Sequence, residues 1–377
     1  MSWTRRRTLQ ALGGLVAWGG APRSWAGSDE APRLILVLLR GGLDGLAAVP
    51  PHGDPDLARA RPRLRDEGVL ALDSTFGLHP ALGPLVPLYE RDELLAVHAV
   101  GTPYRGRSHF DAQDILESGG QAQSTGWLNR ALAASDAREA VVLAQAVPLA
   151  LTGPAPVVTV APNSPPQAGP STLDRVALLY ADDPELAGLL ARGREDQARV
   201  QDAGDTDHRG PRAAWPVLAQ LMAAPGGPTV GLLDLDGWDT HLRQGPRLET
   251  LLAGLADGLA SLPQALGPIW SKTVVLVVSE FGRTVAENGT RGTDHGTGGL
   301  ALLAGGAVRG GRVIADWPGL GPRDQLDGRD LRPTTDLGQV VKGVLGDHLG
   351  LTRQVLDRDV LPSGARVQPL AGLVRGR

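Results

Sequence analysis

The stretch that decides the fold is KTVVLVVSE, residues 272–280. Valine and leucine follow one another here without alternating polar residues, and the run ends in an acid, Glu280. A short continuous apolar run of this kind is typical of a strand that is buried on both faces, as in the parallel sheet of an α/β protein. We therefore predict a buried strand that carries Glu280 at its carboxyl end.

Other apolar runs of the chain resemble this stretch, and helical patterns separate them. The further predicted strands are residues 33–39, 94–100, 228–236 and 299–308. The predicted helices are residues 81–91, 108–117, 127–134, 184–200, 212–223, 247–265 and 335–349. Strands that alternate with helices predict an α/β fold, with a doubly wound, mostly parallel sheet covered by helices on both faces.

The first 26 residues have the features of an export signal. Three arginines at 5–7 precede a short apolar run, as in a twin-arginine signal, and Ser24-Trp25-Ala26 fits a cleavage site. We expect recognition by the twin-arginine export machinery, cleavage after Ala26, and a periplasmic or extracellular location. An uncleaved N-terminal helix is the alternative. No later run is apolar over 18 residues, so we expect no stable membrane span after cleavage.

Length and composition narrow the class of protein. We expect residues 27–377 to form a single domain, with a proline-rich, loop-rich insertion around residues 152–170. The net charge of −4 argues against a nucleic-acid partner. Only 2 of the 37 basic residues are lysine, so the arginine content reflects a composition bias and is weak evidence for phosphate binding. The absence of cysteine excludes disulfides, thiolate metal sites and a cysteine nucleophile.

Acids and histidines follow the predicted strands, where ligands bind in open parallel sheets. They are Asp44 in RGGLDGL, Asp239 and His241 in DLDGWDTH, Glu280 with Arg283 in SEFGRT, and Asp294 with His295 in RGTDHGTGG. Carboxylates mixed with imidazoles suit Zn, Mn or Fe, so a metal site is one interpretation. The alternatives are local: Asp44 caps a turn, Asp239 caps a helix, Arg283 pairs with Glu280, and residues 291–299 form a flexible turn.

A second kind of site is indicated by YRGRSHFDAQD. Ser108 and Asp111 form an S-x-x-D helix start, so Ser108 lies at a helix N-terminus that favours anions. Its hydroxyl is either a nucleophile or a plain cap. Arg105, Arg107 and His109 add positive charge beside it. The motifs of P-loop proteins, of α/β-hydrolases and of zincin proteases are absent.

Taken together, these strings resemble a bacterial family known as domain of unknown function 1501. They include LLRGGLDGLAAVPPHGDP, FGLHPAL, PYRGRSHFDAQD, GWLNRAL, GWDTH, SEFGRTVAENGTRGTDHGTGG, GGAVRGG, DWPGL and TTDLGQVV, and they extend over almost the whole mature chain. The family looks like a branch of the alkaline phosphatase and sulfatase superfamily. That resemblance implies a doubly wound sheet, with one or two divalent metals at the strand ends and a nucleophile at a helix N-terminus.

Carried over to this chain, the resemblance implies roles for individual residues. Asp44, Asp239, His241, Glu280, Asp294 and His295 would hold the metals, whose identity (Zn, Mn, Ca or Fe) stays open. Ser108 would be the nucleophile, and Arg107 and Arg283 would hold the anion. The chain departs from the superfamily at Glu280-Phe281, where an Asp-His pair is usual, so we expect Asp294-His295 to supply the missing imidazole.

These expectations define the predicted function. The chain is predicted to be an exported metal-dependent hydrolase of phosphate or sulfate monoesters, with an anionic ester as its substrate. The alternative is a non-catalytic cell-envelope binding or assembly protein that retains the fold and part of the site. A weaker alternative is phosphate transfer to an acceptor alcohol on the same scaffold.

Overall fold

The structure is a computed structural model that describes residues 31–64, 68–120, 123–135, 139–144, 146–160 and 211–376, with a few positions between 177 and 191. The side chains of residues 211–213 are not described. The predicted signal peptide, residues 1–26, and most of the helix predicted at 184–200 lie outside these residues. In the part that is described, no helix is both long enough and apolar enough to cross a membrane.

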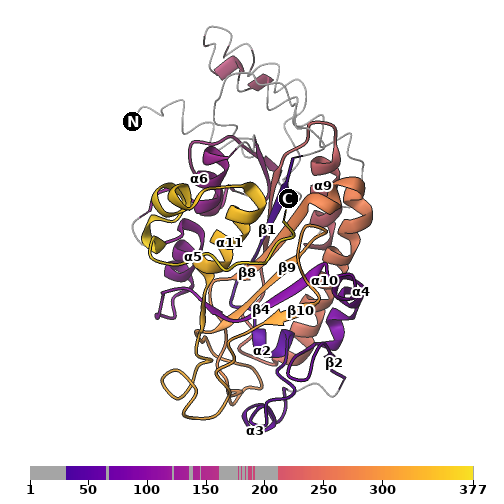
Figure 1. Ribbon diagram of the computed structural model, residues 1–377, viewed down its shortest axis with the longest axis vertical. Coiled ribbons are helices and arrows are strands. Elements are labelled where there is room, and N and C mark those ends of the chain that lie inside the picture. The colour runs from indigo at the N-terminus through magenta and orange to yellow at the C-terminus, as the bar shows by residue number, and fades with distance from the viewer. Residues whose placement is uncertain are drawn as a thin grey trace.

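A nine-stranded sheet forms the centre of the molecule (Figure 1). Its order is β10-β4-β9-β8-β1-β7-β5-β6, and β11 also pairs with β4. The strands are β1 (Arg33–Leu39), β4 (Leu94–Gly101), β5 (Ala140–Leu143), β6 (Val157–Val160), β7 (Val230–Leu235), β8 (Thr273–Ser279), β9 (Gly299–Ala304), β10 (Arg312–Ile314) and β11 (Thr335–Asp336). A separate small ribbon pairs β2 (Leu70–Ala71) with β3 (Gly77–Leu78).

The predicted α/β fold with a mostly parallel sheet is confirmed. All neighbours pair in parallel except β9, which is antiparallel to both β4 and β8. β1 lies between β7 and β8, and its seven residues are all buried. Burial on both faces explains why these strands are unbroken apolar runs in the sequence.

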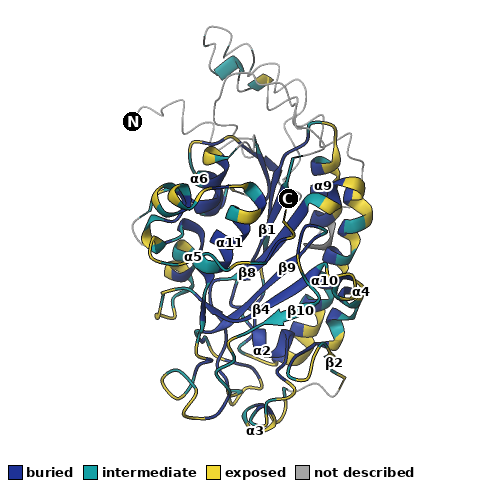
Figure 2. Ribbon diagram, viewed as in Figure 1, coloured by how far each residue is buried: buried dark blue, intermediate teal, exposed yellow. Residues whose placement is uncertain are grey.

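Helices cover both faces of the sheet (Figure 1). The alternate β1 residues Ile35, Val37 and Leu39 share one core with η1 (Pro80–Leu85), α4 (Val86–Glu90), α9 (Pro211–Ala223) and α10 (Gln244–Leu266). Leu34, Leu36 and Leu38 share the other with α6 (Trp127–Ala134), α11 (Leu337–Leu349) and one residue of α5 (His109–Ser118). Figure 2 shows the buried strands between helices that are exposed on their outer sides.

Short elements complete the described part of the chain: α2 (Gly45–Ala48), α3 (Leu57–Ala60), η2 (Leu149–Leu151), η3 (Gly267–Lys272), α12 (Arg353–Val355), η4 (Leu356–Val360) and η5 (Pro362–Gly364). Six strands of two to four residues were not predicted as strands: β2, β3, β5, β6, β10 and β11. β6 lies within the insertion predicted at residues 152–170 and pairs with β5 at one end of the sheet. Residues 161–170 lie outside the described part.

The strand directions place the polar loops together. β1, β7 and β8 are parallel, and β4 runs the same way because β9 is antiparallel to both β4 and β8. The loops after these four strands, and the start of α5, therefore meet at the carboxyl edge of the sheet. Polar side chains gather at this edge.

Candidate metal centre

Three side chains from three separate segments of the chain meet at the carboxyl edge. His109 is the first residue of α5, Asp239 lies in the loop after β7, and His295 lies in the loop between β8 and β9. One potential ligand atom from each lies within 4.8 Å of the others, so the three could hold a metal ion. His241, in the same loop as Asp239, places its Nε2 2.9 Å from the Nε2 of His295.

The imidazoles of His109, His241 and His295 are each held through Nδ1 by an oxygen atom. The pairs are His109 with Glu280 Oε1 at 2.8 Å, His241 with Asp294 Oδ1 at 3.2 Å, and His295 with the carbonyl oxygen of Arg107 at 3.0 Å. Oxygen acceptors at Nδ1 imply that Nδ1 carries the proton of the neutral ring. The Nε2 lone pairs are then free, as in histidines that bind metals.

The free Nε2 atoms converge on the carboxylate of Asp239. Its Oδ1 lies 3.0 Å from His241 Nε2 and 3.2 Å from His295 Nε2. His109 Nε2 lies 3.6 Å from Asp239 Oδ2, and it is buried without a hydrogen-bond partner. Lone pairs that face one another repel unless a proton or a metal cation lies among them, so this donor set fits a divalent metal.

The protonation of the cluster agrees with ligand chemistry. Burial is the main cause that lowers the pKa of His295, which favours its neutral, ligating form. Burial works to raise the pKa of Asp239, but the guanidinium of Arg283 and the imidazoles of His241 and His295 outweigh it, so the pKa is lowered and the carboxylate stays charged. The cluster thus combines a charged carboxylate with imidazole nitrogens.

Glu280 and Asp294, predicted as ligands, bind the histidines instead. Glu280 accepts hydrogen bonds from Gly41 N at 2.8 Å and Gln113 Nε2 at 3.1 Å, besides that from His109. Burial alone would raise its pKa, but these bonds lower it. The hydrogen bond from Asn288 is the main cause that lowers the pKa of Asp294. Both carboxylates therefore remain charged and orient the imidazoles.

Arg283 does not face the open site, which corrects its prediction as an anion holder. It is 1% exposed. Its guanidinium donates to the carbonyl oxygens of Gly41, Gly42, Trp238 and Thr293, and to Asp239 Oδ1 at 2.7 Å. Gly41 permits the close approach of the loops after β1 and β7, because a Cβ there would lie 2.3 Å from Asp239 N. Arg283 therefore joins the loops and positions Asp239.

Asp44 is not brought into the cluster, which corrects its prediction as a metal ligand. Its carboxylate accepts two bonds from Arg61, at 2.7 and 2.9 Å, one from Gln244 Nε2 at 2.6 Å, and one from Ala47 N at 3.2 Å. The last bond caps α2, as the capping alternative requires. Both oxygens of the carboxylate already accept hydrogen bonds, so neither is left to bind a cation.

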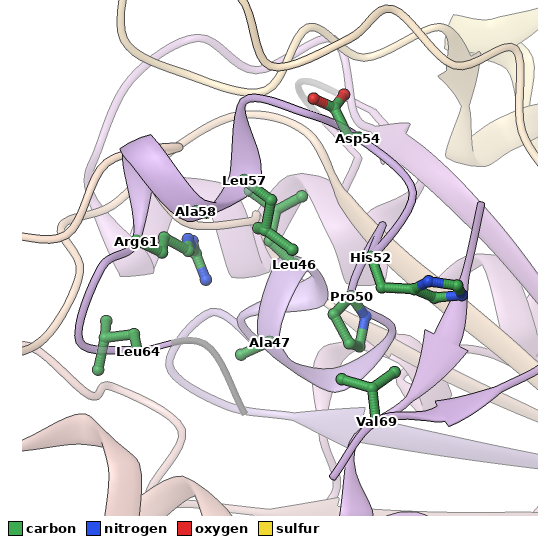
Figure 3. A pocket seen from close by; sticks show the side chains of 10 residues that line it. All are labelled: Leu46, Ala47, Pro50, His52, Asp54, Leu57, Ala58, Arg61, Leu64 and Val69. Atoms are coloured by element: carbon green, nitrogen blue, oxygen red, sulfur yellow. The ribbon is translucent and has the colours of Figure 1, made fainter. Parts of the chain in front are cut away.

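Arg61 also lines a cavity of about 160 Å³ (Figure 3). Leu46, Leu57 and Val69 contribute apolar walls, and no residue of the metal centre lines it. The cavity is therefore separate from the candidate site.

Ser108 and Arg107 flank the cluster. Ser108 is the N-cap of α5, and its Oγ accepts a hydrogen bond from Asp111 N at 3.4 Å. No hydrogen bond in the described part of the chain joins this hydroxyl to the three histidines. The side chain of Arg107 is exposed, and its carbonyl oxygen holds His295.

The sequence does not indicate His109 as a ligand, because it lies in a basic segment in which it is expected only to add positive charge. The S-x-x-D start was the available signal, since it places the next residue at the first position of a helix at this edge. Gln113, one turn later in α5, was also missed. The flexible-turn interpretation of residues 291–299 does not hold, because His295 and Asp294 contact His241.

Comparisons with known proteins give a family and distant structural matches. A family model described as "Protein of unknown function (DUF1501)" matches residues 68–362. No protein with a curated description matches the sequence. The fold is similar to a structure titled "Ps i-CgsB in complex with k-i-k-neocarrahexaose", with a TM-score of 0.38, 10% identity and coverage of 90% of this chain and 77% of that one. It is also similar to the soluble domain of lipooligosaccharide phosphoethanolamine transferase A from Neisseria meningitidis, with a TM-score of 0.30, 12% identity and coverage of 73% and 77%.

Proposed function

The chain belongs to the DUF1501 family, and from its candidate metal centre we propose that it is a metal-dependent hydrolase of phosphate or sulfate monoesters. One observation carries the proposal. Three imidazoles, each with Nδ1 held by an oxygen, direct Nε2 toward one carboxylate, Asp239. Such convergence of acceptors is costly for a purely structural cluster, because in the described chain Arg283 donates to one oxygen of Asp239, while the Nε2 atoms of the neutral imidazoles have no donor.

The residues of the cluster have separate tasks. His109, Asp239 and His295 would hold a divalent metal, with His241 beside them. A bound divalent metal would polarise an ester oxygen and lower the pKa of a hydroxyl or water. Glu280, Asp294 and the Arg107 carbonyl orient the imidazoles, while Arg283 positions Asp239.

The N-terminus of α5 supports an anionic ester as substrate. This helix has 10 residues, and its first amides lie next to His109, so the helix dipole favours an anion beside the cluster. We retain Ser108 as the proposed nucleophile, since its hydroxyl precedes His109 directly. The exposed side chain of Arg107 is free to approach the anion.

Two exposed apolar side chains flank the cluster. Phe110 is 82% exposed and follows His109, and Leu242 is 61% exposed and follows His241. In the described part of the chain these are the large hydrophobic residues that are exposed. Their position favours an ester whose leaving group is apolar or carries a ring, because burial of these side chains would contribute to binding.

We also propose that the enzyme acts outside the cytoplasm. The basis is the sequence of its first 26 residues, which have the pattern of a twin-arginine signal. A folded protein can follow this route, so the metal would be bound before export.

The test measures metal content and hydrolysis on the same natively purified chain. We expect at least one equivalent of Zn, Mn, Ca or Fe and turnover of an aryl phosphate or aryl sulfate. His295→Ala should lose both, because it removes a ligand. Ser108→Ala should keep the metal and lose at least ~100-fold in kcat, the order of a nucleophile or acid–base group.

The outcomes separate the alternatives. A chain without bound metal would exclude the proposal. Metal binding without turnover of either ester class would favour the non-catalytic binding protein. Arg323→Gln serves as the control and should leave metal and turnover unchanged, because Arg323 is exposed and has no hydrogen bond or ion pair with the cluster in the described part of the chain.

A further inference from the structure

A polar hollow lies at the opposite edge of the sheet from the candidate metal centre. It has a volume of about 530 Å³, and four arginines line it together with one acid, Asp92: Arg91, Arg309, Arg312 and Arg375. Arg91 precedes β4 and Arg312 begins β10. These strands are parallel, so the arginine hollow, as we call it, lies at their amino edge.

The charges of two of these arginines are not neutralised by carboxylates. Arg375 donates to the carbonyl oxygens of Val308, Arg91 and Asp92 at 2.9, 3.1 and 3.0 Å. Arg312 donates to Gly372 O at 2.6 Å, while its Nε is buried without a partner. Carbonyl oxygens satisfy N–H groups but leave the full positive charge, and a partly buried charge without a counter-ion is costly.

Arg309 adds a cation that is available to a ligand. Its side chain is exposed, and in the described part of the chain its guanidinium has no hydrogen bond or ion pair. Arg91 is the exception among the four, because it pairs with Glu93 at 3.0 Å. The hollow therefore keeps a net positive charge.

Main-chain hydrogen bonds hold the hollow in its shape. Gly310 N binds Asp92 O at 2.8 Å, Arg309 N binds Leu373 O at 3.0 Å, and Arg375 N binds Ala307 O at 2.8 Å. These bonds tie three segments of the chain that are distant in sequence. A ligand would thus meet arginines whose backbones are already in place, which lowers the cost of binding.

We propose that the arginine hollow binds an oligoanion that carries two or more phosphate or sulfate groups. Guanidinium groups form paired hydrogen bonds with both kinds of oxyanion. Several cations facing one volume favour a ligand with several charges over a single inorganic ion. This site is independent of the proposed hydrolase site.

The experiment is calorimetric titration of the full chain carrying His295→Ala, so that the metal centre does not contribute. The ligands are tripolyphosphate, a sulfated disaccharide and inorganic sulfate. We expect saturable binding of one or both oligoanions, at least tenfold tighter than binding of inorganic sulfate and weakened by added salt. The comparison of the two oligoanions tells whether phosphate or sulfate is preferred.

Variants locate the binding. Adding Arg309→Gln should weaken it about tenfold, the loss expected for one charge-assisted hydrogen bond. In the described part of the chain the side chain of Arg309 makes no hydrogen bond or ion pair, so folding should be intact, which the melting temperature will verify. Arg323→Gln removes an exposed arginine elsewhere and should change nothing. Absence of saturable binding, or equal affinity with and without Arg309→Gln, would overturn the proposal.

Discussion

Asp44 and Asp239 occupy equivalent places and have different surroundings. Each is a carboxylate a few residues past a central parallel strand, at the same edge of the sheet. The side chain of Asp44 is 0% exposed and meets Arg61, Gln244 and a main-chain amide, which are all donors. The side chain of Asp239 is 43% exposed and meets one guanidinium and the lone pairs of histidines.

The difference indicates what distinguishes a structural acid from a candidate metal ligand. A carboxylate surrounded by donors is satisfied and stabilises the fold, because its hydrogen bonds compensate its burial. A carboxylate surrounded by other acceptors leaves a place for a cation. The residue type and its place after a strand were the same in both cases, so the neighbours decide the role.

The largest loss of stability should come from removing the carboxylate of Asp44, whose hydrogen bonds are satisfied by buried donors. Asp44→Ala leaves the guanidinium of Arg61, 1% exposed, without its carboxylate. We expect a loss of about 3–5 kcal/mol in the free energy of unfolding, as for a broken buried ion pair. Urea denaturation measures it.

The control is Asp294→Asn at the metal centre, whose exposed carboxylate should contribute less than about 1 kcal/mol. If Asp44→Ala kept wild-type stability but lost bound metal, Asp44 would be a metal ligand and its assignment as a structural acid would be wrong.

The second-largest effect on stability concerns His98, a buried histidine whose two ring nitrogens both have hydrogen-bond partners. Its Nε2 lies 3.0 Å from Val49 O, its Nδ1 accepts from Ala99 N, and burial lowers its pKa from 6.5 to about 4. The unfolded chain therefore binds a proton at a higher pH than the folded chain. The stabilisation is complete above pH 6.5 and is lost as the pH falls toward 4, by up to about 3 kcal/mol.

Denaturation as a function of pH in wild type and His98→Gln tests this. The difference in stability between the two proteins should shrink as the pH falls through this window. A difference that does not vary with pH would show that His98 has its ordinary pKa.

The smallest effect is expected from Glu280, which orients His109. Glu280→Gln keeps the shape of the side chain but removes its charge, so the imidazole becomes a weaker ligand. We expect metal affinity to fall about 10–100-fold with the number of bound ions unchanged. Competition with a chelator measures it.

Glu249→Gln, an exposed acid on α10, is the matched control. If Glu280→Gln lowered the melting temperature of the metal-free chain and left metal affinity intact, Glu280 would have a structural role alone.

The central strands were predictable because a strand that is buried on both faces consists of consecutive apolar residues. The runs at residues 33–39 and 272–280 became β1 and β8 almost without change. β5 and β6 were missed because four apolar residues are too few to distinguish a strand from a loop. The direction of β9 depends on its pairing with β4 and β8, which its own residues do not encode.

The candidate site was predictable only in part, because contacts between distant segments are not encoded in the residues of either segment alone. Asp239, His241 and His295 could be grouped because loops after parallel strands meet at one edge. The partner of Asp44 could not be predicted, since Arg61 reaches it from a separate turn of chain. His109 was missed because the direction of a side chain at the start of a helix depends on how α5 packs.

Arg283 has a consequence for the order of folding. Its guanidinium bonds to the carbonyl of Gly41, 242 residues earlier in the chain, and to that of Trp238, 45 residues earlier. Contacts this distant in sequence form only after most of the chain has been ordered, because closing long loops costs entropy. We therefore expect the loops of the candidate metal centre to reach their final positions late, so that a metal ion would be bound by the assembled sheet and would not act as the nucleus around which the chain folds.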